Sequence, residues 1–151
     1  MKLTCITGLP GTGKTHLAKQ LEAETGAIRL SRDEIRAKLF PSPTYSAAEK
    51  AKAFDAMIIS AAHELSQGND VILEGMPFST RAQRGAARDL ALLMSADFEL
   101  IHCVCPEYLA LRRIAAQDHP AADRSESLYL VVKSRFEPFG DDEKVTEVNT
   151  G

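Results

Sequence analysis

The spacing of apolar and polar residues along the chain predicts a regular alternation of short strands and helices. Apolar runs at residues 3–7, 71–73 and 98–104 are typical of buried strands. Shorter runs at residues 27–30 and 145–148 bring the expected number of strands to five. Because a helical pattern separates each strand from the next, we expect a mostly parallel five-stranded sheet with helices on both faces.

Helical spacing, bounded by capping and breaking residues, predicts the segments between the strands. We expect helices at residues 16–25, 31–39, 46–67, 79–94, 106–116 and 125–136. Ser31 or Asp33 is expected to cap the second helix, and Gly68-Asn69 to end the third. A polar loop at residues 117–124 separates the last two helices. We therefore expect a single three-layer α/β domain over residues 1–151.

The segment after the first expected strand matches G-x-x-x-x-G-K-[ST], the motif of a phosphate-binding loop. This loop, called the P-loop below, consists of Gly8, Leu9, Pro10, Gly11, Thr12, Gly13, Lys14 and Thr15. Its glycines let backbone N–H groups approach phosphates, and the following helix adds the partial positive charge of its N-terminus. Lys14 is expected to reach the β- and γ-phosphates, and the Thr15 hydroxyl to bind Mg²⁺. We therefore expect the fold of the P-loop NTPases, with ATP and Mg²⁺ as cofactors.

Composition narrows the range of partners. The chain carries a net charge of −3, which argues against tight binding to long nucleic acids. No apolar run is long enough to span a membrane, and the first strand begins within a few residues, so we expect neither membrane association nor a signal peptide. Cys5, Cys103 and Cys105 lie on expected buried strands and are interpreted as reduced core thiols, which points to the cytoplasm.

The whole pattern resembles the small P-loop kinases, namely the group of polynucleotide kinases, zeta-toxins and nucleoside monophosphate kinases, and thus an AAA-type, kinase-like ATP-binding protein. Ser31-Arg32-Asp33-Glu34-Ile35-Arg36 looks like the Asp-x-x-Arg element of polynucleotide kinases. That resemblance implies that Asp33 is the general base on the acceptor hydroxyl and that Arg36 binds an acceptor phosphate. The alternative is that Asp33 only caps a helix and Arg36 is a solvated charge.

A second segment, Glu74-Gly75-Met76-Pro77, resembles the Asp-Gly-Phe-Pro segment of adenylate kinases. The resemblance implies that Glu74 helps to hold Mg²⁺ through water. Phe78 stands where adenylate kinases place an arginine that binds the acceptor phosphate. Arg81 or Arg84 would compensate for that missing arginine, unless each is a surface charge of its helix.

The segments on either side of the 117–124 loop resemble the lid of polynucleotide kinases. Pro106-Glu107 followed by Leu111-Arg112-Arg113 looks like the entry to such a lid. Gln117 stands where those kinases carry a further arginine, and Arg124 at the far end of the loop would replace it. By this resemblance, Arg113 and Arg124 stabilise the transferring phosphoryl group when the lid closes.

These features predict an ATP-dependent kinase that phosphorylates a hydroxyl of a small-molecule or nucleotide acceptor. A polynucleotide 5′-hydroxyl kinase is the first alternative, so a nucleic-acid acceptor stays open. A non-catalytic ATP-binding switch is the second, and Asp33 and the lid arginines argue against it. The sequence leaves open the identity of the acceptor, the preferred nucleotide and the oligomeric state.

Overall fold

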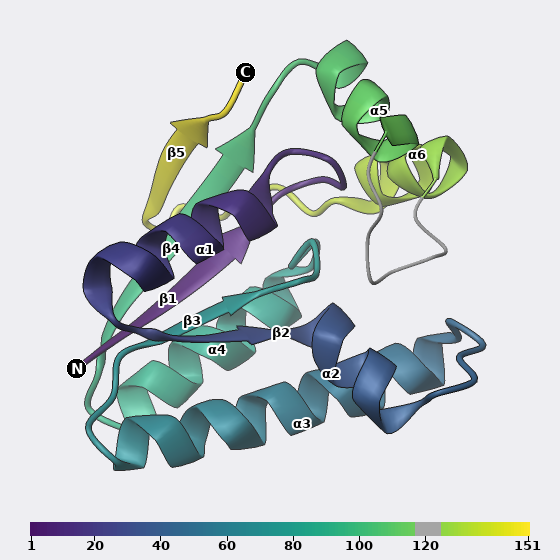
Figure 1. The fold of residues 1–151 in the computed structure, drawn as a ribbon. Coiled ribbons are helices and arrows are strands. Elements are labelled where there is room, and N and C mark those ends of the chain that lie inside the picture. Colours follow the sequence, from purple (N-terminus) through teal and green to yellow (C-terminus); the bar gives the residue numbers. More distant parts are fainter. Residues whose placement is uncertain (117–124) are drawn as a thin grey trace.

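A computed structural model describes residues 1–116 and 125–151 and contains one five-stranded sheet (Figure 1). The strands are β1 (Lys2–Thr7), β2 (Ile28–Ser31), β3 (Val71–Glu74), β4 (Asp97–Val104) and β5 (Val145–Asn149). Their order in the sheet is β2-β3-β1-β4-β5, and every neighbouring pair is parallel. The predicted three-layer P-loop fold is confirmed, and the sheet is wholly rather than mostly parallel.

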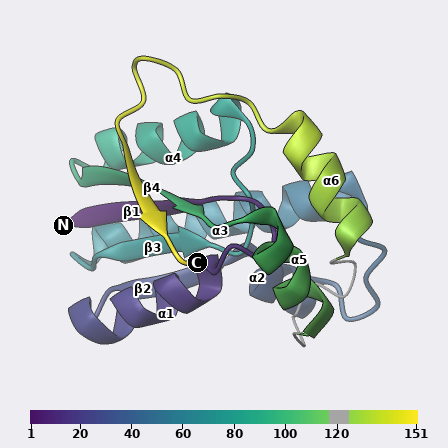
Figure 2. The ribbon, with the colours of Figure 1, turned by 90° about the horizontal axis from the view of Figure 1, so that it is seen from above.

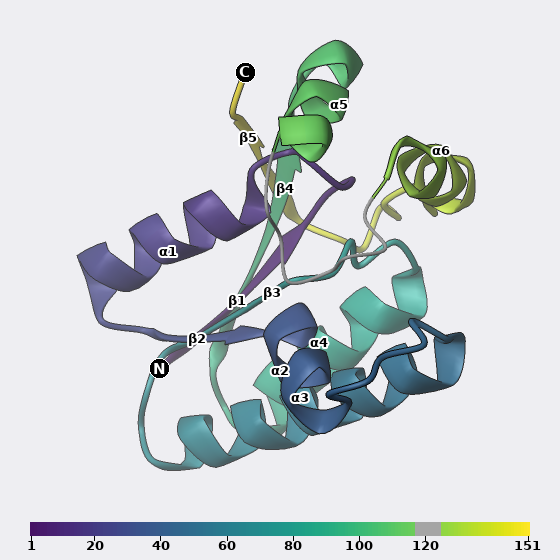
Figure 3. The ribbon, with the colours of Figure 1, turned by 45° about the vertical axis from the view of Figure 1, so that its right-hand side comes forward.

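Helices cover both faces of the sheet. They are α1 (Lys14–Thr25), α2 (Arg32–Leu39), α3 (Ala47–Ser66), α4 (Arg81–Leu93), α5 (Glu107–Ala116) and α6 (Glu126–Arg135). Figure 3 shows α1 on one side of the sheet and α3 and α4 on the other. Figure 2 shows α5 and α6 beyond the end of the sheet opposite the N-terminus. Among the described residues, no helix is both long and apolar enough to cross a membrane.

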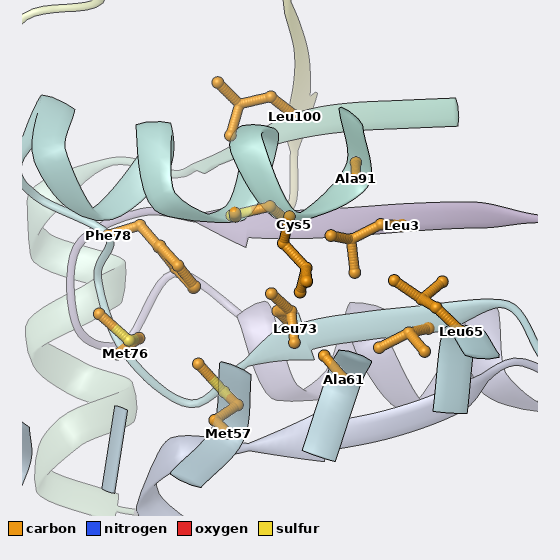
Figure 4. Packing of buried hydrophobic residues seen from close by; sticks show 13 residues of the cluster. Leu3, Cys5, Met57, Ala61, Leu65, Leu73, Met76, Phe78, Ala91 and Leu100 are labelled. Atoms are coloured by element: carbon orange, nitrogen blue, oxygen red, sulfur yellow. The ribbon is translucent and has the colours of Figure 1, made fainter. Parts of the chain in front are cut away.

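The central strand β1 contributes to two hydrophobic cores because it is covered on both faces. Leu3 and Cys5 point towards α3 and α4, where they pack with residues such as Leu73 and Leu100 (Figure 4). Ile6 points to the opposite face and packs near Ala18 of α1. The alternation along β1 thus sets which side of the sheet each helix must cover.

Helix boundaries differ from the expected ones where two capping candidates compete. Ser31 caps α2, because its Oγ accepts the N–H of Glu34 at 3.3 Å. Asp33 therefore lies inside the helix, and its alternative role as the cap is wrong. The fourth helix is capped by Thr80 rather than by Ser79, since Thr80 and Gln83 form a reciprocal capping box. The expected lid loop lies outside the described residues.

The parallel register places the ends of three strands side by side. Ser31, the last residue of β2, is paired with Glu74, the last residue of β3, and β3 is in turn paired with β1. The P-loop, the start of α2 and the turn after Glu74 therefore meet at the carboxyl edge of the sheet, which is where ligands bind in open α/β folds.

Candidate active site

The P-loop connects β1 to α1 and packs tightly against α5. Gly11 has a φ of 78°, a left-handed conformation that favours glycine. A Cβ at this position would lie 3.0 Å from the carbonyl carbon of Ala110 in α5, so a side chain would not fit. Hydrogen bonds within the loop add to its order, since Thr12 Oγ1 donates to the Leu9 carbonyl at 2.7 Å. The loop is thus shaped by its neighbours as well as by its own glycines.

Lys14 is the first residue of α1, and its side chain turns back over the P-loop. Its Nζ donates a hydrogen bond to the Leu9 carbonyl at 2.9 Å. This contact keeps the ammonium group against the loop whose backbone is expected to hold the phosphates. This placement agrees with the prediction that Lys14 supplies a cation to the β- and γ-phosphates, which stays a prediction.

Thr15 and Glu74, the two residues predicted to serve a metal ion, are in direct contact. Thr15 Oγ1 donates to Glu74 Oε1 at 2.9 Å, although the two residues come from α1 and β3. Glu74 is fully buried, and this burial raises the pKa of its carboxyl against the opposing effect of hydrogen bonds from Thr15 and Arg29. A hydroxyl and a carboxylate are the hard oxygen ligands that Mg²⁺ prefers.

One hydroxyl and one carboxylate are compatible with the small number of protein groups that usually bind Mg²⁺. Within residues 1–116 and 125–151, no group of three or more His, Cys, Asp or Glu side chains could hold a metal ion. Mg²⁺ is usually bound by one or two protein groups and completes its shell with phosphate oxygens and water. Thr15 and Glu74 would therefore hold it together with the nucleotide.

Arg29 belongs to the same cluster and was not singled out from the sequence. Its Nη1 donates to Glu74 Oε2 at 2.6 Å and to Glu34 Oε2 at 2.5 Å. These two carboxylates raise the pKa of Arg29, with the hydrogen bond to Glu34 as the largest cause. The available signal was an arginine within a short expected strand, because an arginine that a sheet removes from water nearly always has an acidic partner.

Asp33 is brought to the site by the turn that follows β3. Gly75 has a φ of 80°, and a Cβ there would lie 2.8 Å from the Arg32 nitrogen and 3.1 Å from the Asp33 nitrogen. The turn after Glu74 therefore rests directly on the first turn of α2. Asp33 is 8% exposed, and its Oδ1 lies 3.7 Å from Arg32 Nη2. The geometry thus brings the backbone of the expected base against the turn that follows the expected metal ligand.

Arg36 is enclosed within the fold. Its side chain is fully buried, so the alternative of a solvated charge is wrong. The guanidinium carbon lies 4.4 Å from the centroid of the Tyr45 ring, in a cation–π contact. Arg36 also helps to lower the pKa of Glu49, after the larger effect of a hydrogen bond from Thr44. The side chain is covered in this structure, and its expected role of binding an acceptor phosphate stays a prediction.

Arg113 reaches from α5 to the P-loop and to the end of β5. Its Nη1 lies 3.4 Å from the Gly11 carbonyl and 3.0 Å from Thr150 Oγ1. Thr150 Oγ1 in turn donates to the Thr12 carbonyl at 2.6 Å. Arg113 therefore lies against the phosphate-binding loop, and its expected role in stabilising the transferring phosphoryl group stays a prediction. Arg124, its expected partner, falls outside the described residues.

Arg84 is a structural residue, which corrects the expectation that it binds the acceptor. It is 1% exposed, and its Nε donates to Glu143 Oε2 at 2.7 Å. Its other nitrogens donate to the carbonyls of Phe78 at 3.0 Å and Glu137 at 3.1 Å. A buried guanidinium with these partners cannot present its donors to a substrate.

Arg81 has the same kind of partners at the surface. Its Nη2 donates to Asp142 Oδ1 at 2.6 Å, and its Nε lies 3.4 Å from Glu143 Oε1. Both arginines therefore tie α4 to the segment that precedes β5, and the structure supports neither as an acceptor ligand.

Comparison with known proteins agrees with this geometry. Residues 3–139 match a family model described as an AAA domain. The chain belongs to this AAA domain family. Because the match spans most of the chain, the resemblance to small, kinase-like P-loop proteins is confirmed. No curated protein matches the sequence.

Solved structures share the fold over nearly the whole chain. A putative kinase from Chloroflexus aurantiacus is 25% identical, with a TM-score of 0.79 over 99% of this chain and 88% of that one. Kti12 from Chaetomium thermophilum, in complex with ADP-AlF3, is 16% identical, with a TM-score of 0.74 over 98% and 89%. The APS kinase CysC from Mycobacterium tuberculosis, in complex with AMPPNP and APS, is 21% identical, with a TM-score of 0.66 over 99% and 88%.

Proposed function

We propose that this AAA domain protein is an ATP-dependent kinase that transfers the γ-phosphate of ATP to a hydroxyl of a small-molecule or nucleotide acceptor. The observation that carries the proposal is the cluster at the carboxyl edge of the sheet. There the P-loop residue Thr15 contacts Glu74, and the turn after Glu74 rests on the helix that bears Asp33. The likeness to a putative kinase at 25% identity supports it.

The residues of the chain have distinct roles in this proposal. The backbone N–H groups of the P-loop and the N-terminus of α1 bind the phosphates, and Lys14 adds a cation near the β- and γ-phosphates. Bound Mg²⁺ would neutralise charge on these phosphates, and Thr15 would hold it directly and Glu74 through water. Arg113 lies beside Gly11 and is suited to stabilise charge on the transferring group.

Asp33 orients the acceptor hydroxyl and accepts its proton. The oxygen of that hydroxyl forms a new bond to the γ-phosphorus, while the bond between this phosphorus and the β–γ bridging oxygen breaks and ADP leaves. A carboxylate contributes to such a step by proton transfer and by alignment of the nucleophile. Because Ser31 serves as the cap of α2, the Asp33 carboxylate is not needed for helix capping.

The test is transfer of labelled phosphate from γ-³²P-ATP in the presence of Mg²⁺. One reaction contains pooled sugars, nucleosides and other hydroxylated metabolites, and the other contains 5′-hydroxyl oligonucleotides. We expect label on a small molecule. Label on the oligonucleotide alone would instead support a polynucleotide kinase. Nucleotide binding without transfer to any acceptor would support a non-catalytic switch.

Lys14→Ala is the matching loss-of-function variant, because it removes the cation at the β- and γ-phosphates. We expect it to abolish transfer in a folded protein. The control is Lys19→Ala, which removes an exposed lysine from the same helix and should leave transfer unchanged. Full activity of folded Lys14→Ala would contradict the proposal. We expect the protein to act in the cytoplasm, where its free cysteines stay reduced.

A further inference from the structure

Arg29 is a largely covered charged residue of the site to which the proposed function gives no role. Its side chain is 12% exposed and comes from β2, on the face of the sheet that α1 covers. Its guanidinium contacts the carboxylates of Glu34 and Glu74, and its Nε lies 3.7 Å from Glu22 Oε1. These contacts connect β2 with α1, α2 and β3 at the edge where the nucleotide is expected.

The two carboxylate oxygens of Glu74 have different partners. Oε1 accepts the Thr15 hydroxyl, whereas Oε2 accepts Arg29 Nη1. Arg29 therefore leaves the oxygen next to Thr15 available and fixes the direction in which the carboxylate points. It also supplies the charge that a fully buried carboxylate needs, since an unpaired buried charge is strongly unfavourable.

Arg29 also holds the first turn of α2 through Glu34, the neighbour of Asp33 in the sequence. Such bridging suits arginine, whose planar guanidinium presents several donors in a fixed geometry. One side chain thus connects the expected metal ligand with the helix that carries the expected base.

We infer that Arg29 is a positioning residue that holds Glu74 towards Thr15 and thereby sets the magnesium dependence of nucleotide binding. The inference rests on the proposed function. Its consequence is that loss of Arg29 weakens the Mg²⁺-dependent part of ATP binding. The part due to the P-loop backbone is retained, because that backbone is formed by a separate segment.

The experiment measures binding of N-methylanthraniloyl-ATP by fluorescence, first in EDTA and then during titration with Mg²⁺. We expect Arg29→Met to raise the Mg²⁺ concentration at half-maximal binding by about 10–100-fold, the usual effect of removing a residue that orients a metal ligand. Affinity in EDTA should stay unchanged. Arg88→Met, which removes a half-exposed arginine paired with Asp142, is the matched control and should behave as wild type.

Two further variants separate positioning of Glu74 from a merely structural role. Glu34→Gln keeps the contact between Arg29 and Glu74, so its Mg²⁺ dependence should stay close to that of the wild type. In a Glu74→Gln background, adding Arg29→Met should have no further effect, because Arg29 acts through the carboxylate already removed. Fully additive effects of these two substitutions would overturn the inference.

Circular dichroism establishes whether each variant folds. If Arg29→Met does not fold, Arg29→Lys replaces it in the experiment. This variant keeps the charge but loses the guanidinium geometry. We expect it to raise the Mg²⁺ concentration at half-maximal binding in the same direction as Arg29→Met, but by a smaller factor. If a folded Arg29 variant reaches half-maximal binding at the wild-type Mg²⁺ concentration, the inference about Arg29 is overturned, but the proposed function is not. A wild-type protein that does not bind the fluorescent ATP at all would contradict the proposed function instead.

Discussion

At the scale of single residues, the site depends on which side chains are held close to the P-loop and which are committed elsewhere. Asp33 is nearly buried beside the turn after Glu74, whereas Arg36 in the same helix is covered by Tyr45. Asp33 and Arg36 belong to the same sequence motif and the same helix, but their surroundings differ. We therefore propose Asp33, rather than Arg36, as the residue of this helix that acts on the acceptor at this edge.

Asp33→Asn tests this assignment with almost no change in shape. We expect the rate of phosphoryl transfer to fall by about 10²–10⁴-fold, because the amide cannot accept the proton of the hydroxyl. ATP affinity should stay the same, since Asp33 is not part of the P-loop. The control is Asp55→Asn, an exposed site on α3. Weaker ATP binding with an unchanged rate at saturation would assign Asp33 to nucleotide or metal binding instead.

At the scale of elements, the site depends on the contact between the turn after β3 and the start of α2. Gly75 allows this contact because it has a positive φ and no side chain. The same turn positions Glu74, which faces Thr15. A change at Gly75 should therefore affect the distance between the metal ligand and the base, as well as stability.

Gly75→Ala should be both destabilising and damaging to catalysis. Its left-handed backbone alone costs about 1–2 kcal/mol with an alanine, and the new Cβ would collide with Ser31 and the Arg32 nitrogen. Gly68→Ala is the matched control, because Gly68 has a φ of 83° and a Cβ added there would meet nothing within 4 Å. Urea unfolding should show a larger decrease in the free energy of unfolding for Gly75→Ala than for Gly68→Ala. Only Gly75→Ala should transfer phosphate more slowly than the wild type.

At the scale of the whole molecule, buried ion pairs join segments that are far apart in the sequence. Arg84 binds Glu143, which lies 59 residues later and precedes the edge strand β5. The aromatic rings of Phe136 and Phe139 pack over its guanidinium at 5.6 and 4.5 Å. Arg84 therefore ties the connection from α6 to β5 to helix α4.

Arg84→Met should lower the free energy of unfolding by about 3–5 kcal/mol, because it removes the nearest cation from the nearly buried Glu143 and leaves only the longer contact with the half-exposed Arg81. Arg88→Met, at an exposed ion pair on the same helix, should cost no more than about 1 kcal/mol. Equilibrium unfolding in urea measures both. Equal, small effects would show that the Arg84 contacts contribute little to the stability of the fold.

The same ion pair predicts a dependence of stability on pH. Burial raises the pKa of Glu143, but hydrogen bonds from Arg84 and the Gly140 N–H, with the nearby arginine charges, outweigh it and hold the pKa below the ordinary 4.5. A lowered pKa stabilises the folded state above the ordinary value, and this contribution is lost as pH falls through the folded pKa. The stability difference between wild type and Glu143→Gln should therefore be constant near neutral pH and shrink below about pH 4.5. A difference that does not change with pH would contradict this assignment.

The sequence by itself determined the features that depend on local physics. Strand and helix periodicity, capping residues and breaking glycines are properties of short segments, so the five strands and the helices were predicted to within a few residues. The P-loop was equally clear, because its glycines, Lys14 and Thr15 act within one strand–turn–helix unit. The contact between the two metal candidates, Thr15 and Glu74, depends in addition on the parallel register that ends β1 and β3 at one edge of the sheet.

Only the tertiary structure decided the roles of the arginines. Arg29 meets Glu74 across 45 residues of sequence, and Arg84 meets Glu143 across 59. Helical spacing shows which face a charge occupies, but it does not show which distant carboxylate arrives on that face. Arg84 was therefore considered for acceptor binding and Arg29 was overlooked. Their roles follow from burial, because a charge removed from water must find its partner within the folded chain.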